Sequence, residues 1–434
     1  MRVLVTGASG FIGAHIVGAL IEAGHAVTGC ARDVASAKRR CPAAGWIACD
    51  FNRSLPASFW APHLEGVGAI VNCAGLLQGS ARQSLARVHH TGPAALFDAA
   101  ATAGVRRVVQ ISALGIEDSD TGYAATKRAG DEHLKSLDLD WIVVRPSLVY
   151  GAGAYGGSAL MRGLAGFPFV TPLPGGGKTQ KFQPIAMDDL ARGIAGLVEP
   201  KTPARLVLDA AGPETMTLRQ IVPLLRGWLG FAPAPVLAVP TGLIALGARL
   251  GDVGRWFTGR GTVTTTAIRQ MEAGALGDGA GFAKASGVTL RPMAEALSTT
   301  PSQTQDRWHA RIYFARPLLR ITMALFWIAA GLVVARPETR EQAAELLKSV
   351  GFAEAYLSPL IWSGAIVDTG LGLALLLRWR VRLVGTGMLG VSAFYLAVLS
   401  WGAPEVWFDP LGSLTKILPI MAAIVLMMAL EDDR

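Results

Sequence analysis

The sequence predicts two domains of different fold classes: an α/β domain with a doubly wound parallel sheet and a small substrate-side cap, followed by an all-α domain of four transmembrane helices. Up to about residue 300, short apolar runs alternate with helical patterns, and a glycine-rich motif follows the first run. After Pro317 the apolar runs lengthen to the size of membrane spans. The length of 434 residues also exceeds what one hydrophobic core normally serves.

The α/β domain is predicted from short apolar runs that suit strands covered on both faces. These runs are Val3 to Val5, Ala26 to Cys30, Ala69 to Cys73, Arg107 to Ile111 and Trp141 to Val144. The helical segments between them include Gly13 to Glu22, Ala94 to Ala103 and Ala124 to Leu137. We expect the α/β-like portion from Arg205 to Gly230 to cap the carboxyl edge of the sheet.

The domain boundary is predicted at the polar run from Ser298 to Gln305. We therefore expect a nucleotide-binding domain over 1–297, a linker over 298–310 and a membrane domain over 311–434.

The membrane domain is predicted from four apolar segments, at about 317–335, 359–377, 383–401 and 414–430. Each approaches the ~20 residues that a helix needs to cross a bilayer. The alternative, a soluble bundle, would leave helices that are apolar almost all round without a shield. Because the amino terminus carries no export signal, we expect a multi-pass inner (cytoplasmic) membrane protein whose nucleotide-binding domain lies in the cytoplasm. Arg378, Arg380 and Arg382 then also face the cytoplasm.

The net charge of +8 does not indicate nucleic-acid binding, because the basic residues are scattered and no aromatic residues interleave with them. The basic residues from Arg307 to Arg320 suit membrane orientation better. The four cysteines lack the close pairing of a metal or redox site, and the few histidines are unclustered, so we expect no metal.

The strongest motif is the run from Thr6 to Gly13, TGASGFIG, between the first strand and the first helix. Gly7 permits a tight turn, Gly10 lets a pyrophosphate approach the backbone, and Gly13 allows close helix packing. The helix amino terminus favours the negative charge. The motif, with its intervening Ser9, Phe11 and Ile12, predicts dinucleotide binding rather than a structural turn.

The choice between NAD and NADP falls after the second strand, at Arg32 and Asp33. Arg32 suits a 2′-phosphate, whereas Asp33 suits a ribose hydroxyl, and the spacing alone does not decide. The basic residues from Lys38 to Arg40 favour NADP. Further cofactor contacts are predicted at Asp50, with an adenine contact or a strand end as its alternatives, and at Ala74 and Gly75, which follow another strand.

Tyr123 and Lys127 are four residues apart, so they share one helical face. A nearby cation lowers the pKa of a tyrosine, which can then exchange a proton with a carbonyl or alcohol while hydride moves. The alternative is a solvated helix face. The glycine motif and the strand that ends at Ile111-Ser112 favour the functional interpretation.

These motifs, together with the run RPSLVYG from Arg145 to Gly151, resemble the extended and atypical short-chain dehydrogenase/reductases, in the NAD-dependent epimerase/dehydratase superfamily. Within it, VVQISALG, YAATKRAGDEHL and FQPIAMDDLARGI are similar to the NAD(P)H-binding accessory subunit of respiratory complex I. The resemblance covers about Met1 to Met293. It implies a Rossmann-type fold.

The resemblance also implies residue roles. Tyr123 and Lys127 match the family's catalytic pair, Lys127 would also hold the nicotinamide ribose, and Pro146 joins the cofactor contacts. Ser112 is the candidate for the catalytic serine, although the family's serine usually lies just after it, where this chain has Ala113 and Leu114. His89 replaces the family's asparagine.

The carboxyl-terminal part, with IVDTGLGLALLL, resembles DoxX-like membrane domains over about Arg311 to Arg434. Asp368 falls inside the second predicted span, where an ionised group is costly unless it is paired or faces a polar cavity. Lys416 is its candidate partner, and snorkelling to the interface is the alternative for that lysine.

Two functions follow from these patterns. The first is a membrane-tethered, NADPH-dependent oxidoreductase acting on a hydrophobic carbonyl or alcohol. The second is a non-catalytic NADPH-binding structural or sensor protein whose membrane domain engages lipid, quinone or a respiratory membrane-protein partner. A nucleotide-sugar epimerase or dehydratase ranks third, because it leaves the membrane domain unexplained.

Overall fold

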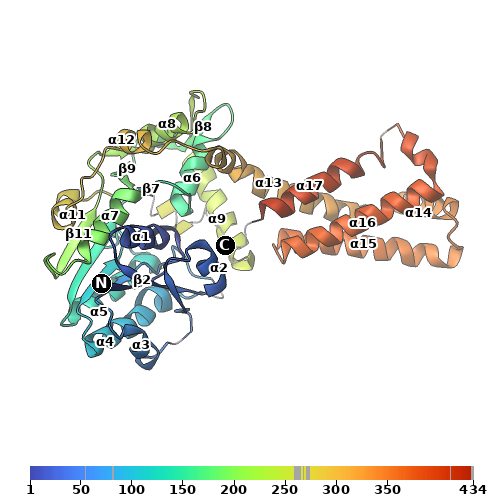
Figure 1. The fold of residues 1–434 in the computed structure, drawn as a ribbon. Coiled ribbons are helices and arrows are strands. Elements are labelled where there is room, and N and C mark those ends of the chain that lie inside the picture. Colours follow the sequence, from blue (N-terminus) through green and yellow to red (C-terminus); the bar gives the residue numbers. More distant parts are fainter. Residues whose placement is uncertain are drawn as a thin grey trace. The chain divides into compact units, whose positions relative to one another are not determined.

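The computed structural model describes residues 1–53, 55–80, 83–258, 265–266, 268–269, 274–410 and 412–431 (Figure 1). The chain divides into two compact units, Met1–Arg311 and Ile312–Arg434, which we call unit 1 and unit 2.

The described part of unit 1 is built on a seven-stranded parallel sheet. In spatial order the strands are β11 (Leu206–Ala210), β6 (Asp140–Pro146), β5 (Arg107–Ile111), β4 (Ala69–Asn72), β1 (Arg2–Thr6), β2 (Ala26–Ala31) and β3 (Gly45–Ala48). The prediction of a doubly wound parallel sheet is confirmed. All five predicted strands are present. The sheet also contains β3 and β11, which the sequence analysis did not predict as strands.

One part of the cap prediction is wrong. Residues 206–210, expected in the cap, form β11 and pair in parallel with β6, from Leu206 opposite Ile142 to Ala210 opposite Pro146. The short run LVLDA thus completes the sheet at its edge instead of covering it.

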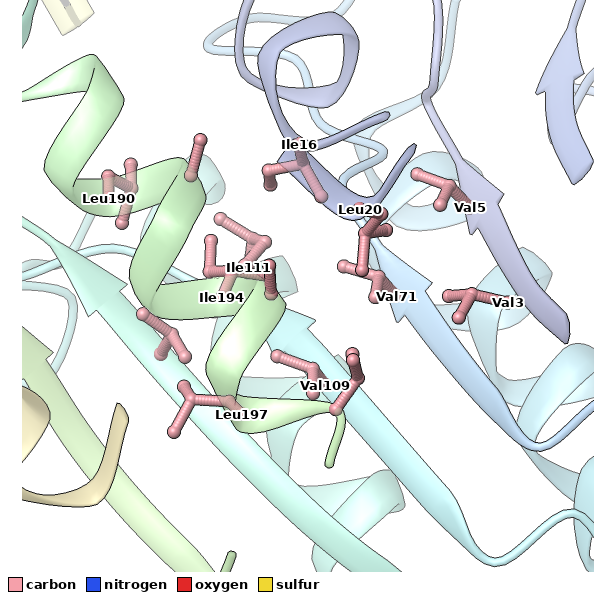
Figure 2. Close-up of a cluster of buried hydrophobic side chains, with 14 of the residues drawn as sticks. Val3, Val5, Ile16, Leu20, Val71, Val109, Ile111, Leu190, Ile194 and Leu197 are labelled. Carbon is pink, nitrogen blue, oxygen red and sulfur yellow. The ribbon is translucent and has the colours of Figure 1, made fainter. Parts of the chain in front are cut away.

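Helices cover both faces of the sheet. On one face, α1 (Phe11–Glu22), α7 (Met187–Leu197) and α11 (Gly279–Ser286) pack against the strands, and Figure 2 shows Ile16, Leu20 and Ile194 in one cluster with Val71 and Val109 of the sheet. On the other face, α3 (Ala57–Leu64), α4 (Gly92–Ala103) and α5 (Gly122–Ser136) contribute buried side chains such as Trp60, Phe97 and Leu134. The helix α2 (Val34–Arg40) joins β2 to β3, and a π-helical turn, Arg87–Thr91, precedes α4.

The cap has its own apolar core, which holds Met161, Leu218, Ile221, Leu225 and Met293. Its helices are α6 (Gly156–Ala165), α8 (Leu218–Trp228) and α12 (Met293–Ser298), and α9 (Thr241–Thr258) follows the last cap strand. Its short strands are β7 (Val149–Tyr150), β8 (Thr171–Pro174), β9 (Lys181–Phe182), β10 (Ile185–Ala186), β12 (Met216–Thr217) and β13 (Val236–Val239), and a 3-10 turn spans Gly175–Gly177.

The segment predicted as a linker, 298–310, packs on the cap instead. The helix α13 (Thr304–Val333) already begins there, and the boundary between the units falls within it. Arg162 of α6 donates to Asp306 over 2.7 Å. The backbone of Gly166 lies so close to Ala310 that an added Cβ would be 2.7 Å from the Ala310 Cβ. These contacts order the polar residues that a linker would leave in water.

Unit 2 is helical where it is described. After α13 come α14 (Pro337–Ser349), α15 (Glu354–Leu376), α16 (Val381–Gly402), a 3-10 turn (Pro404–Phe408) and α17 (Ile417–Leu430). In the described residues, α13, α15 and α16 are long and apolar enough to cross a membrane. The fourth predicted span coincides with α17, which has 14 residues and is shorter than the other three. Glycines bring these helices close, since a Cβ on Gly331 would meet Thr369 and one on Gly372 would meet Ile328.

Candidate functional site

The predicted site residues gather at the carboxyl edge of the sheet. The glycine loop follows β1, Ala74 and Gly75 follow β4, Ser112 follows β5, and Pro146 is the last residue of β6. The strand order reverses between β1 and β4, and ligands of open parallel sheets bind outside such a reversal. The topology therefore brings together residues that are far apart in the sequence.

The glycine loop has the geometry of a phosphate-binding turn. Gly7 has a φ of +63°, and a Cβ there would lie 2.7 Å from the Cys73 carbonyl carbon. A Cβ on Gly13 would lie 2.2 Å from the Gly7 oxygen, so the first turn of α1 packs directly on the loop. Gly10 is exposed at the amino end of α1, where no side chain caps the helix. The backbone N–H groups at this uncapped helix end suit an anion such as a pyrophosphate.

The polar residues after β2 and β3 differ in the hydrogen bonds that their side chains make. Arg32 is exposed, directly after β2. The carboxylate of Asp33 caps α2 by accepting from the Ser36 N–H over 2.9 Å. Asp50 accepts from the Asn52 backbone N–H over 3.0 Å in a tight turn. Arg32 is thus the residue of this group whose side chain is most open to a ligand.

Tyr123 and Lys127 lie on α5 beside the ends of β4 and β5. The Lys127 ammonium donates to the Ile111 carbonyl oxygen over 2.8 Å, and a Cβ on Gly75 would lie 3.4 Å from the Lys127 Nζ. Burial lowers the pKa of Lys127, whereas Asp131 and Cys73 oppose that shift. The absence of a side chain at Gly75 therefore leaves space next to the ammonium.

The expected lowering of the Tyr123 pKa is wrong in this structure. Desolvation raises the pKa of Tyr123 to about 12, and the nearby carboxylate of Asp131 adds to the increase. The phenol is consequently protonated at neutral pH, a state that suits a proton donor.

Ser112, the predicted serine of the site, belongs to a buried polar network. Its hydroxyl donates to Asp131, which also accepts from Gln110 Nε2 over 3.3 Å. Gln110 in turn accepts from Asn72 Nδ2 over 2.6 Å, and Asn72 accepts from the Thr6 hydroxyl. The network connects β1, β4, β5 and α5 under the site.

Asp131 is the site residue that the sequence analysis missed. It is buried one helical turn beyond Lys127, at the i,i+4 spacing that places both side chains on one face. Burial raises its pKa, although its hydrogen bond from Ser112 and the charge of Lys127 oppose the shift. The spacing from Lys127 was the available signal.

His89, noted as a departure from the family pattern, is buried beside Tyr123 and Lys127. Its ring packs edge-on against Tyr123 with the centroids 5.4 Å apart, and its Nε2 accepts from the Leu76 N–H over 3.0 Å. Its Nδ1 lies 2.9 Å from the Thr126 hydroxyl oxygen. Burial, followed by the charge of Lys127, lowers the pKa of His89 to about 3. A neutral imidazole thus connects the loop after β4 to α5.

Two further features lie away from this edge. A small interior cavity of the cap is lined by residues such as Tyr150, Met161 and Trp228, and none of the predicted site residues borders it.

In unit 2, Asp368 is buried, and its Oδ1 has no hydrogen-bond partner in the described part of the chain. Lys416 is exposed, and the ion pairs found among the described residues do not join it to Asp368.

Two family models match the chain. Residues 3–195 match the NAD dependent epimerase/dehydratase family, and residues 324–425 match the DoxX-like family. The chain joins an epimerase/dehydratase domain to a DoxX-like domain. The DoxX-like domain and its long apolar helices make the protein membrane-associated, and the epimerase/dehydratase domain is of a nicotinamide-dependent enzyme type.

Two curated relatives of the epimerase/dehydratase domain are named as reductases. A ceramide reductase of Caulobacter vibrioides is 26% identical over 251 residues, which cover 57% of this chain and 76% of the relative. A 3-diazoavenalumate denitrifying reductase of a Streptomyces species is 34% identical over 203 residues, which cover 41% of this chain and 66% of the relative.

Solved structures share the fold of the epimerase/dehydratase domain. A UDP-glucuronic acid 4-epimerase of Bacillus cereus, solved with UDP-glucuronic acid and NAD, superposes with a TM-score of 0.53 at 17% identity, over 69% of this chain and 97% of its own. A dTDP-glucose 4,6-dehydratase of Streptomyces venezuelae, solved with NAD, superposes with a TM-score of 0.53 at 22% identity, over 71% of this chain and 97% of its own.

Proposed function

We propose that this protein is a membrane-bound, nicotinamide-dependent oxidoreductase that reduces a carbonyl group of a hydrophobic substrate. The observation that carries the proposal is the placement of Tyr123 and Lys127 at the carboxyl edge of the sheet, next to the glycine loop. The reductase names of both relatives support the reaction class. The DoxX-like domain supports a substrate that partitions into lipid.

The site residues fit a dinucleotide. The φ of Gly7, the exposed Gly10 and the missing side chain at Gly75 leave a path from the amino end of α1 to Lys127. When bound, a reduced nicotinamide supplies hydride to the carbonyl carbon. Tyr123 donates its phenolic proton to the carbonyl oxygen, which receives the electron pair of the C=O bond. The Lys127 ammonium stabilises the phenolate that Tyr123 becomes, and Asp131 opposes loss of the lysine charge.

NADPH is the proposed cofactor form. Arg32 is exposed at the end of β2, whereas Asp33 already caps α2. The test is a fluorescence titration of the full chain with NADPH and with NADH, using Arg32→Ala and, as a matched control, Arg106→Ala, which removes an exposed arginine just before β5 at the opposite edge of the sheet. We expect Arg32→Ala to weaken NADPH binding by about tenfold, the scale of one charge-assisted contact, and to leave NADH binding unchanged. Equal losses for the two nucleotides would contradict this assignment.

A non-catalytic NADPH-binding role is the second candidate, and one observation favours it. Ala113 and Leu114 stand just after Ser112, where the family's serine usually lies, and the Ser112 hydroxyl already donates to Asp131. Tyr123→Phe separates the two functions in a turnover assay with membrane-lipid carbonyl compounds. For an enzyme we expect at least a hundredfold loss of turnover, since general acid catalysis contributes about 10²-fold or more, with unchanged nucleotide affinity. A binding protein shows no turnover in either form.

The proposed topology places the nucleotide-binding domain and the segment from Arg378 to Arg382 in the cytoplasm, at the inner membrane. The end of α17 belongs on the same side, because Glu431 contacts Arg378 and Arg382. α17 therefore returns the chain to the end of unit 2 at which α15 ends.

A further inference from the structure

A three-residue turn in the cap exposes an aromatic side chain at a strained backbone position. The Val170 N–H donates to the Pro168 carbonyl oxygen over 2.7 Å, and Phe169 between them has a φ of +64°. A turn of this kind, with a bulky residue at positive φ, is rare and strained. Phe169 is nevertheless 88% exposed, so neither burial nor backbone conformation favours a phenylalanine here.

The turn is fixed beside the start of α13. The backbone of Gly166 lies against Ala310, where an added Cβ would be 2.7 Å from the Ala310 Cβ. Arg226 of α8 donates to the carbonyl oxygens of Ala165 and Phe167, over 2.8 Å and 2.9 Å. The residues before the turn are therefore held between α8 and α13.

The start of α13 adds a second exposed aromatic residue and two arginines. Trp308 is 65% exposed, and Arg307 and Arg311 beside it are also exposed. The Arg311 guanidinium lies 5.0 Å from the centroid of the Phe231 ring, and a Cβ on Gly230 would lie 2.7 Å from Arg307 Nη2. We call the following five residues the docking surface: Phe169, Phe231, Arg307, Trp308 and Arg311.

The segments that form the docking surface are positively charged. Residues 162–170, 226–235 and 306–311 contain four arginines and one aspartate, a net charge of +3. The aspartate, Asp306, is paired with Arg162. No carboxylate of these segments therefore remains to match the charge of Arg307 and Arg311.

The sequence after the docking surface indicates its partner. The same helix, α13, continues to Val333 and is long and apolar enough to cross a membrane. Its apolar stretch begins at Pro317, six residues after Arg311, which is about 9 Å along a helix. Tryptophan beside an apolar span is typical of the headgroup region, and positive side chains this near a bilayer are attracted to anionic lipids.

We propose that the docking surface rests in the headgroup region of the bilayer with which unit 2 associates. The rings of Phe169 and Trp308 lie among the lipids, and Arg307 and Arg311 contact the phosphates of anionic lipids. Exposed apolar side chains next to basic ones are the combination that binds a membrane surface. Burial of the Phe169 ring in the bilayer offsets the strain of its turn. The inference is independent of nucleotide binding and of any activity of the epimerase/dehydratase domain.

The first test measures whether position 169 contacts lipid. The full chain with Phe169→Cys is labelled with a maleimide of the dye NBD and placed, one chain per disc, in nanodiscs of phosphatidylglycerol and phosphatidylcholine. Some discs contain a lipid with a nitroxide quencher near its headgroup. The control position is Ala103→Cys, at the exposed end of α4, and the labelled natural chain gives the background. We expect the nitroxide to quench most of the fluorescence at position 169 and little at position 103.

The second test concerns the arginines. Arg307→Gln/Arg311→Gln is introduced into the chain labelled at position 169. The matched control, Arg106→Gln/Lys201→Gln, removes two exposed positive charges near Arg107, at the amino edge of the sheet. At about fivefold per arginine, we expect the ratio of quenched to unquenched dye to fall roughly 30-fold in the first variant, and to be unchanged in the control.

Equal quenching at positions 169 and 103 would overturn the proposal. Equal effects of the two double variants would overturn the assignment of Arg307 and Arg311 to anionic lipids. An unquenched dye at position 169, together with a dimer in detergent that Trp308→Gln dissociates, would assign the docking surface to a second copy of the chain.

A measurement without the dye tests whether the Phe169 ring serves the fold instead. Asparagine tolerates positive φ, so the full chain with Phe169→Asn should unfold in detergent at a urea concentration no lower than that of the natural chain. A clear loss of stability in this variant would show that the ring supports the cap, and it would overturn the role of Phe169 in the docking surface.

Discussion

At the scale of single residues, His89 shows how a site position is defined by its hydrogen bonds. Nε2 accepts from a backbone N–H, so the proton of the neutral ring is on Nδ1, which donates to the Thr126 hydroxyl oxygen. The Thr126 hydroxyl in turn donates to the Gly122 carbonyl oxygen over 2.8 Å. A charged imidazolium would have to break the bond from Leu76, and the ammonium of Lys127 also disfavours it.

This arrangement predicts a pH-dependent stability. The pKa of His89 is about 3 in the folded protein and 6.5 as the unperturbed value. Because folding lowers the pKa of His89, the stability that its neutral ring contributes is fully present above pH 6.5, and it is lost as the pH drops towards 3. The unfolded state gains about 2 kcal/mol from protonation at pH 5. Urea unfolding at pH 7 and pH 5 should show this loss in the natural chain and not in His89→Gln.

The comparison with His89→Gln separates the effect of His89 from the effects of other titrating groups. Carboxylates contribute equally to both chains, so the difference between the two pH dependences isolates the imidazole. An identical loss of stability in His89→Gln would mean that the histidine is charged, or accessible to water, in the folded protein.

Asp368 gives a second residue-scale prediction. Its carboxyl is buried in α15, with an oxygen that lacks a partner among the described residues. Such a group costs free energy that an apolar side chain of similar size does not. Asp368→Leu should therefore raise the thermal unfolding temperature of the full chain in detergent, whereas Ser363→Leu, on an exposed hydroxyl of the same helix, should not. A lower temperature for Asp368→Leu would indicate that the carboxyl has a stabilising partner.

At the scale of elements, the sequence predicts the centre of the sheet better than its edges. The strands β1, β4 and β5 are buried along almost their whole length and form clear apolar runs. β3 and β11 are edge strands with half-buried residues, so their apolar signal is weak. Their position becomes evident only from their pairing with β2 and β6.

The same contrast holds for the site. The glycine loop and the Tyr123–Lys127 pair are each contained in one turn or one helix, so their spacing reveals them. The network from Thr6 through Asn72 to Asp131 joins three strands and a helix, and its partners depend on the strand register. Nothing in the local spacing of these polar residues indicates which of them meet.

The start of α13 provides a prediction at this scale. Arg162 is buried and pairs with Asp306, and its guanidinium also lies 4.9 Å from the Trp228 ring centroid. A chain that ends at Ser298 leaves this guanidinium without its carboxylate, whereas one that ends at Arg311 retains it. Loss of one partner of a buried pair costs about 3–5 kcal/mol. Urea unfolding should show this difference between the two chains, and Asp306→Asn in the longer chain should reproduce most of it.

If the two truncated chains unfolded at the same urea concentration, residues 298–311 would be the linker that their polar sequence predicts. A smaller effect of Asp306→Asn alone would assign the remainder to the packing of Ala310 against Gly166.

At the scale of the whole molecule, the charges of unit 2 predict its orientation in the membrane. We expect the end of unit 2 that carries Arg378, Arg380 and Arg382 to lie on the cytoplasmic side, because positive residues near spanning helices resist translocation. Residues 336–354 then face the opposite side. An impermeant maleimide should label Ser349→Cys, an exposed position of α14, on intact cells, and Arg380→Cys only after permeabilisation. The natural chain is the control, because its four cysteines all precede residue 74 and should react only in opened cells. Labelling of Arg380→Cys from outside would invert the topology and place the nucleotide site away from the cytoplasmic cofactor pool.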